Sequence, residues 1–412
     1  MESGVLTQTS PRNLTRSLAA AIVVIAVFAL SNAATPFYVQ WQKAWAFSSG
    51  TLTIVFATYI AGLIGALLFA GRIADEKGRK VVLIPGLVLA LASSVIFLVA
   101  NNVLALIIAR LFAGISVGAI VTAGMAAVVD LAPEQRKRTA SLIASSAMVL
   151  GAGLGPLLAG AVSRYSSTPQ PLVFGLLVIT SAIALVVAWT LPFPAPASVK
   201  KSRWHFPAPP KENWREVSWG IATFAPGITA TSFVLSLGPS VLSKVLGQTD
   251  ALLAGLIACC MFLAATGVQF ALAKISTRNH LLLSSSAALV STGLLIMTVS
   301  NAGSPVVFFV SALLAGVAQG LGQLAGLTLI ATNVPISHRA ESNASLNIAG
   351  YIPAALLPVL TGYLSDGAGL PVAVATFAVI LSVAAVIALV AVRISSQVLT
   401  AKAESDNEPA SA

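Results

Sequence analysis

Apolar stretches of about 20 residues recur along the whole chain, and no other feature constrains its fold as strongly. Hydrophobic residues make up 57% of the 412 residues and charged residues only 9%, whereas soluble domains carry about 25% charged residues. One soluble core could not bury so much apolar surface, so we expect the stretches to span a membrane. They do not alternate as barrel strands do, and a backbone inside a bilayer must satisfy its own hydrogen bonds. These facts predict helices.

Twelve such stretches are expected to form membrane-spanning helices. Their predicted boundaries are 17–39, 51–71, 81–100, 103–129, 139–163, 171–191, 217–242, 250–273, 281–300, 304–331, 342–364 and 369–393. The first stretch follows Arg12 and Arg16 and contains SNAA at 31–34, which would also fit a cleaved signal peptide. It is longer than a typical signal core and has a counterpart in the second half, which favours a retained span.

The basic residues predict the orientation in the membrane. Nineteen of the 23 Lys and Arg residues fall on the side of the two termini, whereas Lys43, Arg164 and Lys244 fall on the opposite side and Arg110 lies within a span. Because Lys and Arg accumulate in cytoplasmic loops, both termini are expected in the cytoplasm. The bias also explains the net charge of +10 without nucleic acid as a partner. We expect a multi-pass, monomeric protein of the cell (inner or plasma) membrane, surrounded by lipid.

The two halves of the chain resemble each other. At an offset of 202 residues, RLFAGISVG (110–118) aligns with ALLAGVAQG (312–320), Pro156 with Pro358 and Gly160 with Gly362. Several matches at nearly one offset indicate a duplicated six-helix unit. The predicted fold is an all-α integral membrane protein with two pseudo-symmetric six-helix bundles. Its predicted parts are an N-terminal bundle (1–191), a cytoplasmic linker rich in Pro and basic residues (192–216), a C-terminal bundle (217–393) and a disordered cytoplasmic tail (394–412).

The segment GRIADEKGRK (71–80) concentrates six charged residues between two spans. Simple topological anchoring is one explanation, but anchoring requires neither acids nor a fixed order. The order Gly71-x-x-x-Asp75-x-x-Gly78-Arg79-Lys80 resembles the signature loop of the major facilitator superfamily. The resemblance implies that this loop, with Arg72, holds the cytoplasmic ends of the halves together in one state. It implies that Asp75 faces the start of span eleven and that Arg79 pairs with Asp130.

Arg110 is the only charged residue that we place inside a span. An intramembrane charge is costly and indicates function by default. Arg110, Gly114 and Gly118 resemble the superfamily's span-four motif, R-x-x-x-G-x-x-x-G, in which the arginine is associated with proton transfer or with organising the cavity. Two alternatives stay open: an arginine bound to backbone carbonyls of a kinked helix, and a contact for an anionic substrate.

Span five contains GAGLGPLLAG (151–160). Gly151, Gly155, Pro156 and Gly160 resemble the antiporter signature G-x-x-x-G-P-x-x-G-G, with Ala159 in place of one glycine. The resemblance implies a drug/proton antiporter with twelve spans. The alternative is ordinary packing of small residues, which are abundant in this chain.

None of the thirteen acidic residues lies in the middle of a predicted span. A cation in a desolvated cavity requires a counter-charge, so neutral, apolar or weakly acidic substrates are favoured over cationic ones. Polar and aromatic residues expected to line a central cavity could equally make helix–helix hydrogen bonds. They are Asn32, Phe37, Tyr38, Tyr59, Gln319, Gln323, Asn347 and Tyr351.

The sequence gives no sign of an enzyme, a cofactor or a metal site. It lacks a nucleotide-binding loop of the G-x-x-x-x-G-K-S/T type, so the proton gradient is the expected energy source. His205, His280 and His338 are expected in separate cytoplasmic loops, and the adjacent Cys259 and Cys260 are expected to be buried free thiols.

The sequence therefore predicts a secondary transporter that exports small organic compounds, with protons as the counter-substrate and alternating access as the mechanism. One alternative is proton-coupled uptake of a metabolite or organic anion, with Arg110 as the anion contact. Another is a membrane receptor or scaffold that does not transport, although the short loops leave little room for a sensory domain.

Overall fold

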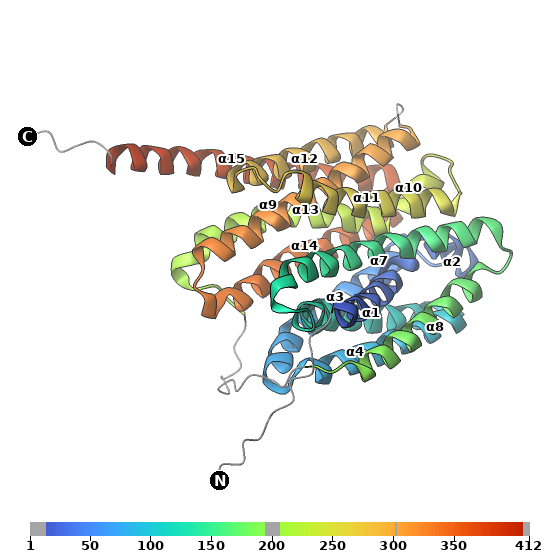
Figure 1. Cartoon of the computed structure of the whole chain (residues 1–412). Coiled ribbons are helices and arrows are strands. Elements are labelled where there is room, and N and C mark those ends of the chain that lie inside the picture. Colours follow the sequence, from blue (N-terminus) through green and yellow to red (C-terminus); the bar gives the residue numbers. More distant parts are fainter. Residues whose placement is uncertain (1–13, 194–206, 301–302, 407–412) are drawn as a thin grey trace, which may run out of the picture. The chain divides into compact units, whose positions relative to one another are not determined.

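The computed structural model describes residues 14–193, 207–300 and 303–406, and at Asp75, Ser337 and 395–406 it describes the backbone alone. Within these residues every regular element is helical. Eleven helical segments are long and apolar enough to cross a membrane, and a bent pair of helices brings the number to twelve if the pair is counted as one span. Each of the twelve predicted spans is thus occupied by helix (Figure 1).

The helices of the first half begin and end close to the predicted boundaries. Spans one and four consist of several consecutive elements, whereas the others are single helices. The elements are α1 (Leu14–Ala33), η1 (Thr35–Phe37), α2 (Tyr38–Trp45), α3 (Ser49–Lys77), α4 (Arg79–Val99), α5 (Val103–Ala119), η2 (Ile120–Gly124), α6 (Met125–Asp130), η3 (Glu134–Arg136), α7 (Lys137–Tyr165) and α8 (Pro169–Thr190).

The second half repeats this order after the linker. A short turn, η4 (Lys211–Asn213), leads into its first span, and η5 (Ile336–His338) precedes its fifth. The elements are α9 (Trp214–Ser236), α10 (Gly238–Lys244), α11 (Ala251–Ala271), α12 (Thr277–Val299), α13 (Pro305–Asn333), α14 (Arg339–Ala368) and α15 (Leu370–Asp406).

Spans one and seven are interrupted at equivalent places. In span one the interruption contains Pro36, and in span seven α9 and α10 meet at an angle of 51° next to Pro239. Proline lacks a backbone N–H and its ring clashes with the preceding turn, so a helix bends or breaks there. The two prolines differ by 203 residues, which agrees with the offset of the sequence repeat. Interrupted helices at equivalent positions of two repeats often mark the binding region of a transporter.

The chain forms two compact units. Unit 1 contains 1–33, 61–155 and 168–205, and unit 2 contains 34–60, 156–167 and 206–412. In unit 1, α4 packs against α5 and α8; in unit 2, α13 packs against α9, α11 and α12. Unit 2 therefore includes one end of spans one, two and five together with the whole second half.

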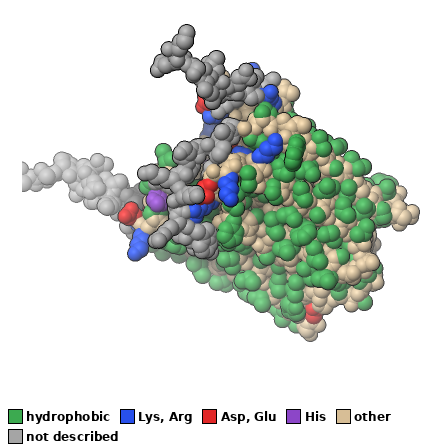
Figure 2. Space-filling model, turned by 90° about the horizontal axis from the view of Figure 1, so that it is seen from below, with side chains coloured by type: hydrophobic (Ala, Val, Ile, Leu, Met, Phe, Trp, Pro, Cys, Tyr) green, Lys and Arg blue, Asp and Glu red, His purple; other side chains and the backbone are tan. Residues whose placement is uncertain are grey.

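The exposed surface is as apolar as a lipid-facing surface requires. Large hydrophobic side chains such as Val186, Leu360 and Ile387 are more than 60% exposed. On the face in Figure 2, hydrophobic side chains cover most of the area and Lys and Arg gather near one edge. A water-soluble protein would expose smaller apolar patches, so this surface is suited to a bilayer.

Candidate gating and transport site

The charged segment 71–80 is a helical joint rather than the loop that the sequence predicted. Helix α3 continues to Lys77 and α4 begins at Arg79, so Gly78 alone connects them. Gly78 has φ 95°, a conformation that other residues adopt only with strain. Gly71 lies inside α3, and a β-carbon there would meet nothing within 4 Å. Among the described residues, no neighbouring helix therefore packs closely at Gly71.

Charged side chains of the joint contact neighbouring helices of unit 1. Arg79 Nε lies 3.3 Å from Asp130 Oδ2 at the end of α6, which is the pairing that the family resemblance implied. Arg72 Nε donates to Glu76 Oε1 at 2.6 Å within α3. The side chain of Asp75 lies outside the described part of the structure, so its contact with span eleven stays a prediction.

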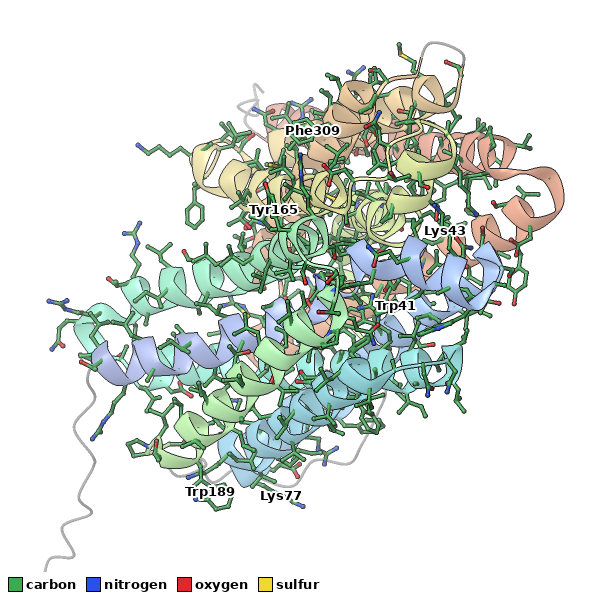
Figure 3. All side chains as sticks on the ribbon, turned by 90° about the vertical axis from the view of Figure 1, so that its right-hand side faces the viewer. Trp41, Lys43, Lys77, Tyr165, Trp189 and Phe309 are labelled. Carbon is green, nitrogen blue, oxygen red and sulfur yellow. The ribbon has the colours of Figure 1, made fainter. Side chains whose placement is uncertain are left out.

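Lys80 connects α4 to the end of α8. Its Nζ donates to the Trp189 carbonyl oxygen at 2.5 Å and lies 5.7 Å from the centre of the Trp189 ring. Lys77 and Trp189 lie at the same end of unit 1 (Figure 3). The joint thus ties α3, α4, α6 and α8 together, and its role in gating remains a prediction.

Arg110 is completely buried in unit 1. Its Nη1 donates to the Ser31 carbonyl oxygen at 2.5 Å, close to the end of α1. The last carbonyls of a helix have no partner within the helix, and a cation is favoured there by the helix dipole. Asn32 Nδ2 donates to Ser31 Oγ at 2.9 Å beside this contact. The geometry matches the alternative in which the arginine binds a backbone carbonyl at an interrupted helix, and it leaves a transport role open.

Span four changes its helical pitch after Arg110. Helix α5 passes into a π-helical turn, η2 (Ile120–Gly124), before α6 ends at Asp130. Such turns are rare in proteins, and those that occur are often found at functional sites. The turn lies between Arg110 and Asp130, the residue that pairs with Arg79. No pattern in the sequence predicted it.

Glycines bring span four against span two. A β-carbon on Gly62 would lie 2.5 Å from the Leu111 carbonyl oxygen, and one on Gly118 would collide with Ala66 and lie 3.0 Å from the Leu63 carbonyl oxygen. Gly114 is buried on the same helix. Gly118 therefore packs closely against α3.

The glycines of span five also contact backbone directly. In unit 1, a β-carbon on Gly151 would lie 2.6 Å from the Ile25 carbonyl oxygen, and Gly155 abuts the backbone of Ala29. In unit 2, a β-carbon on Gly160 would lie 2.5 Å from the Ala251 carbonyl oxygen. Pro156 lies within α7, and Gly255 abuts its carbonyl oxygen. The motif therefore forms a smooth face on which α1 and α11 pack.

The predicted cavity residues divide between the units. Asn32 belongs to unit 1, and the other seven belong to unit 2. Phe37 and Tyr38 are buried, and Phe37 stacks on Trp41 with ring centres 5.3 Å apart. Tyr59, Gln319, Gln323, Asn347 and Tyr351 are half-buried.

Some of these residues make local contacts in unit 2. Asn347 Nδ2 donates to the Asn343 carbonyl oxygen one helical turn earlier, as the helix hydrogen-bond alternative predicts. Tyr351 packs edge-on against Phe224 with ring centres 6.4 Å apart. Their role as cavity residues remains a prediction.

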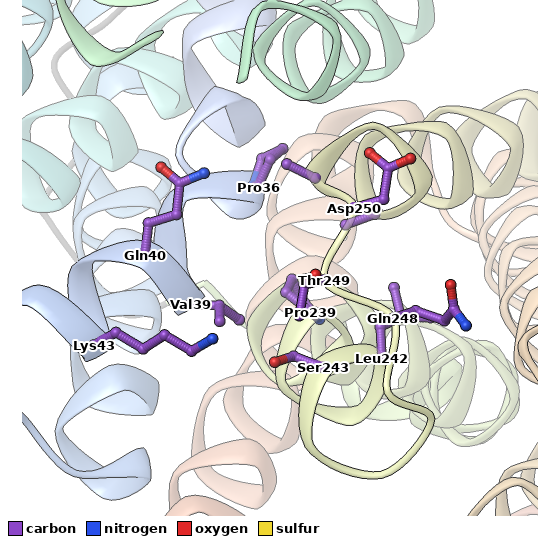
Figure 4. Close-up of a pocket in the computed structure, with 12 residues that line it drawn as sticks. Pro36, Val39, Gln40, Lys43, Pro239, Leu242, Ser243, Gln248, Thr249 and Asp250 are labelled. Carbon is purple, nitrogen blue, oxygen red and sulfur yellow. The ribbon is translucent and has the colours of Figure 1, made fainter. Parts of the chain in front are cut away.

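Unit 2 also has a small open pocket of about 80 Å³ beside the two interrupted spans. It is lined by residues that include Pro36, Lys43, Pro239 and Asp250 (Figure 4). None of the predicted cavity residues lines it.

Two predictions for single residues require correction. His280 is in the first turn of α12 and not in a loop. Its side chain is buried, and its Nε2 donates a hydrogen bond to the Leu272 carbonyl oxygen at 2.9 Å. Cys259 is a buried free thiol as predicted, but Cys260 is half-buried. His205 lies outside the described residues. Within the described residues no group of His, Cys, Asp and Glu side chains could hold a metal ion.

In the part of the chain that the structure describes, an all-helical architecture with up to twelve spans, a repeated order of elements and interrupted helices at matching positions is typical of a multi-pass membrane transporter. The family model of the Major Facilitator Superfamily matches residues 18–300 and 278–412, so the chain belongs to that superfamily and is a membrane transporter. The family match therefore indicates a transporter rather than an enzyme.

Individual relatives are more distant. Over 90 residues the chain is 34% identical to the multidrug resistance protein MdtL of Escherichia coli (strain SE11), a stretch that covers 22% of this chain and 23% of that protein. A bacterial homologue of the human lysosomal transporter Spinster, solved in an inward-facing and unoccupied conformation, has a TM-score of 0.69 at 16% identity, with 93% and 98% of the two chains covered. The peptide transporter POT has a TM-score of 0.71 at 14% identity, with 92% and 94% covered. The two structural similarities establish the fold.

Proposed function

We propose that this transporter exports small organic compounds in exchange for protons, by alternating access of two six-helix bundles (1–191 and 217–393). It works as a monomer in the cell inner membrane, with both termini in the cytoplasm. The observation that carries the proposal is the glycine face of α7. Gly151 and Gly155, two glycines of the antiporter-like motif, contact the backbone of α1. The similarity to MdtL, a multidrug resistance protein, supports the same class of substrate.

Neutral and weakly acidic aromatic compounds are the substrates that the chain accommodates best. Each acidic residue whose side chain the structure describes lies near a helix end or in a connection, not in the middle of a span. A cationic drug would lack a buried counter-charge there, whereas the buried guanidinium of Arg110 tolerates neutral or anionic groups.

The direct test is proton release from everted membrane vesicles. Respiration acidifies the vesicle interior, and a dye that reports the pH gradient shows whether each of a panel of neutral and weakly acidic aromatic compounds discharges it. For export we expect discharge in vesicles containing the protein, and loss of discharge with Gly155→Leu, which forces a side chain into the α1 backbone. Gly65→Leu is the matched control, because a β-carbon at Gly65 would meet nothing within 4 Å.

The test also separates the alternatives. If an acidic exterior instead drives radiolabelled compound into intact cells, the uptake hypothesis replaces export. If no compound in the panel moves with or against protons while the protein is inserted and folded, the proton-antiport proposal is wrong.

A further inference from the structure

In unit 2 the carboxylate of Asp366 connects the C-terminal end of α14 to the N-terminal end of α3. Asp366 Oδ1 accepts a hydrogen bond from the Ser49 N–H at 2.8 Å, and Asp366 Oδ2 accepts one from the Gly50 N–H at 2.9 Å. The Ser48 hydroxyl accepts from the Thr51 N–H at 3.1 Å. The first N–H groups of a helix have no partner within it. Here Ser48, the residue that precedes α3, satisfies one of these N–H groups, and Asp366 of α14 satisfies two.

Close backbone contact accompanies this cap. A β-carbon on Gly50 would lie 2.8 Å from Tyr363 Cδ1 and 2.9 Å from Asp366 Oδ2. A β-carbon on Gly362 would lie 2.7 Å from the Ser49 carbonyl oxygen and would collide with Thr53. We call these residues (Ser49, Gly50, Thr53, Gly362 and Asp366) the α14–α3 seam. Glycine on each helix lets the two helices approach closely, so the carboxylate can reach the N–H groups.

A second seam in unit 2 repeats this plan. Gly160 of α7 abuts Ala251 at the start of α11, and Arg164 Nη1 donates to Asp250 Oδ2 at 2.9 Å. Asp250 Oδ1 accepts from the Leu252 N–H at 2.9 Å and so caps α11. We call these residues (Gly160, Arg164, Asp250, Ala251 and Leu252) the α7–α11 seam.

The repeat offset of 202 residues relates the two seams. It carries Gly160 to Gly362, Arg164 to Asp366 and Ser49 to Ala251. Each seam therefore joins the fifth span of one half to the second span of the other half, at the end that the charge distribution assigns to the outside. Alternating access requires such contacts to open when the cavity faces outward.

We propose that Asp366 is a gating residue of the transport cycle, which caps α3 while the outer side is closed and releases it when that side opens. By the predicted topology, α3 crosses the membrane from the outer to the inner side and α14 crosses it from the inner to the outer side. Asp75, near the end of α3, is the residue predicted to face the start of α14 from the inner side. The two carboxylates then form alternative caps, one for each state. The inference rests on alternating access alone and not on export or protons.

A reporter cysteine tests this without any substrate. Thr53 is completely buried in the α14–α3 seam, so a thiol at Thr53→Cys reacts with a polar maleimide only when the seam opens. The native thiols are removed by Cys259→Ala and Cys260→Ala, and labelling is timed on purified protein in lipid nanodiscs, which leaves both sides accessible. With Asp366→Asn the side chain keeps one acceptor and loses its charge. We expect labelling to accelerate about fivefold or more as the population shifts toward the open state.

Three further variants make the outcome decisive. Glu134→Gln, the same acid-to-amide change on an exposed residue outside the seam, should label at the parent rate. Ser48→Ala removes the cap that Ser48 provides to α3, so a similar acceleration there would mean fraying of the helix and would overturn the proposal. Gly50→Ala pushes a methyl group against Tyr363 and Asp366 and should accelerate labelling even if Asp366→Asn folds poorly. A labelling rate that stays unchanged in both Asp366→Asn and Gly50→Ala would also overturn the proposal.

The labelling result is independent of the vesicle experiment. A chain that exports nothing in exchange for protons can still show the acceleration, and a proton antiporter can lack it. Failure of this inference and failure of the proposed function are therefore distinguishable.

Discussion

The two seams of unit 2 are built on one plan but use charge differently. Gly160 and Gly362 occupy equivalent positions, and each brings its helix against the backbone of another. One turn later the α7–α11 seam has Arg164 in an ion pair, whereas the α14–α3 seam has Asp366 on backbone N–H groups. The comparison indicates that the steric part of a duplicated interface is kept in both copies, while its electrostatics are free to differ.

The same contrast recurs deeper in the two halves. Arg110 in span four corresponds to Ala312 in span ten, and both positions are completely buried. Span four contains a π-helical turn, whereas α13 is a continuous α-helix from Pro305 to Asn333. At these equivalent positions the first half therefore has a buried charge and a π-helical turn, whereas the second half has a small apolar residue and a regular helix.

The largest effect on transport is expected for substitution of Arg110, compared with substitution of Ala312 at the equivalent position. Arg110→Ala removes the donor that Ser31 uses and leaves a buried carbonyl without it, at a cost of about 1–3 kcal/mol. We expect transport to fall about 100-fold, as for loss of a positioned charged group in a water-poor site. Ala312→Ser, at the equivalent position, should transport within about twofold of the parent, well under one tenfold step. Substrate flux in proteoliposomes measures both.

Arg110→Lys distinguishes the two explanations of this residue. Lys keeps the charge and one donor but lacks the planar fork of Arg. If Arg110→Lys keeps both the thermal stability and the transport of the parent, binding of the Ser31 carbonyl is the role of this residue. Normal stability with lost transport would show a role in coupling or in the cavity.

The glycines of the seams should give the next largest effects. Gly160→Leu and Gly362→Leu each force a side chain into backbone atoms, and overpacking of this kind costs about 1–3 kcal/mol. Because the seams share their steric plan, we expect the two variants to lower the thermal unfolding temperature by similar amounts. Gly65→Leu and Gly367→Leu are controls on α3 and α14, where a β-carbon would meet nothing within 4 Å. A difference between the seam variants as large as either effect would contradict the shared plan.

The sequence predicted the fold well because span formation depends on local composition. A helix of about 20 apolar residues satisfies its own backbone, so each span can be recognised without its neighbours. The pairing of Arg79 with Asp130 was predicted as well, because Arg79 belongs to a recognisable motif and Asp130 is an acid at the cytoplasmic end of span four. The proline that interrupts span one was visible in the sequence, but its equivalence to Pro239 became evident only when both spans were seen to be interrupted there.

The contacts of single side chains could not be predicted in the same way. Asp366 lies next to glycines at a predicted span end, and nothing in the local sequence shows that its partner is the start of α3, more than 300 residues away. The Ser31 carbonyl that binds Arg110 is a backbone group, so no residue type marks it. The π-helical turn at Ile120–Gly124 depends on tertiary packing and has no composition of its own.

A smaller effect is expected where the halves differ in the joint after their second span. In the first half Gly78 alone connects α3 to α4, whereas in the second half five residues, Leu272–Ser276, connect α11 to α12. Gly78→Ala places a β-carbon on a backbone with φ 95° and should cost about 1–2 kcal/mol. Gly71→Ala, in open space within α3, should be neutral or stabilising by up to about 1 kcal/mol. Thermal unfolding of both variants checks the contrast, and equal melting temperatures would show that the joint tolerates the strain.

The smallest effect should come from the ion pair of the α7–α11 seam. Arg164 and Asp250 are 51% and 35% exposed, and pairs so exposed contribute about 0–1 kcal/mol. Arg164→Gln should therefore lower the melting temperature less than Asp366→Asn, whose carboxylate binds two N–H groups and the positive end of a helix dipole. Salt sharpens the comparison, because at about 1 M salt the Debye length is about 3 Å and exposed charges are screened. The difference between the parent and Arg164→Gln should vanish at that salt concentration, while hydrogen bonds to the α3 backbone should retain most of the Asp366→Asn effect. If salt removes both differences equally, the two seams rely on the same long-range electrostatics, and Asp366 holds α3 by charge alone rather than by capping it.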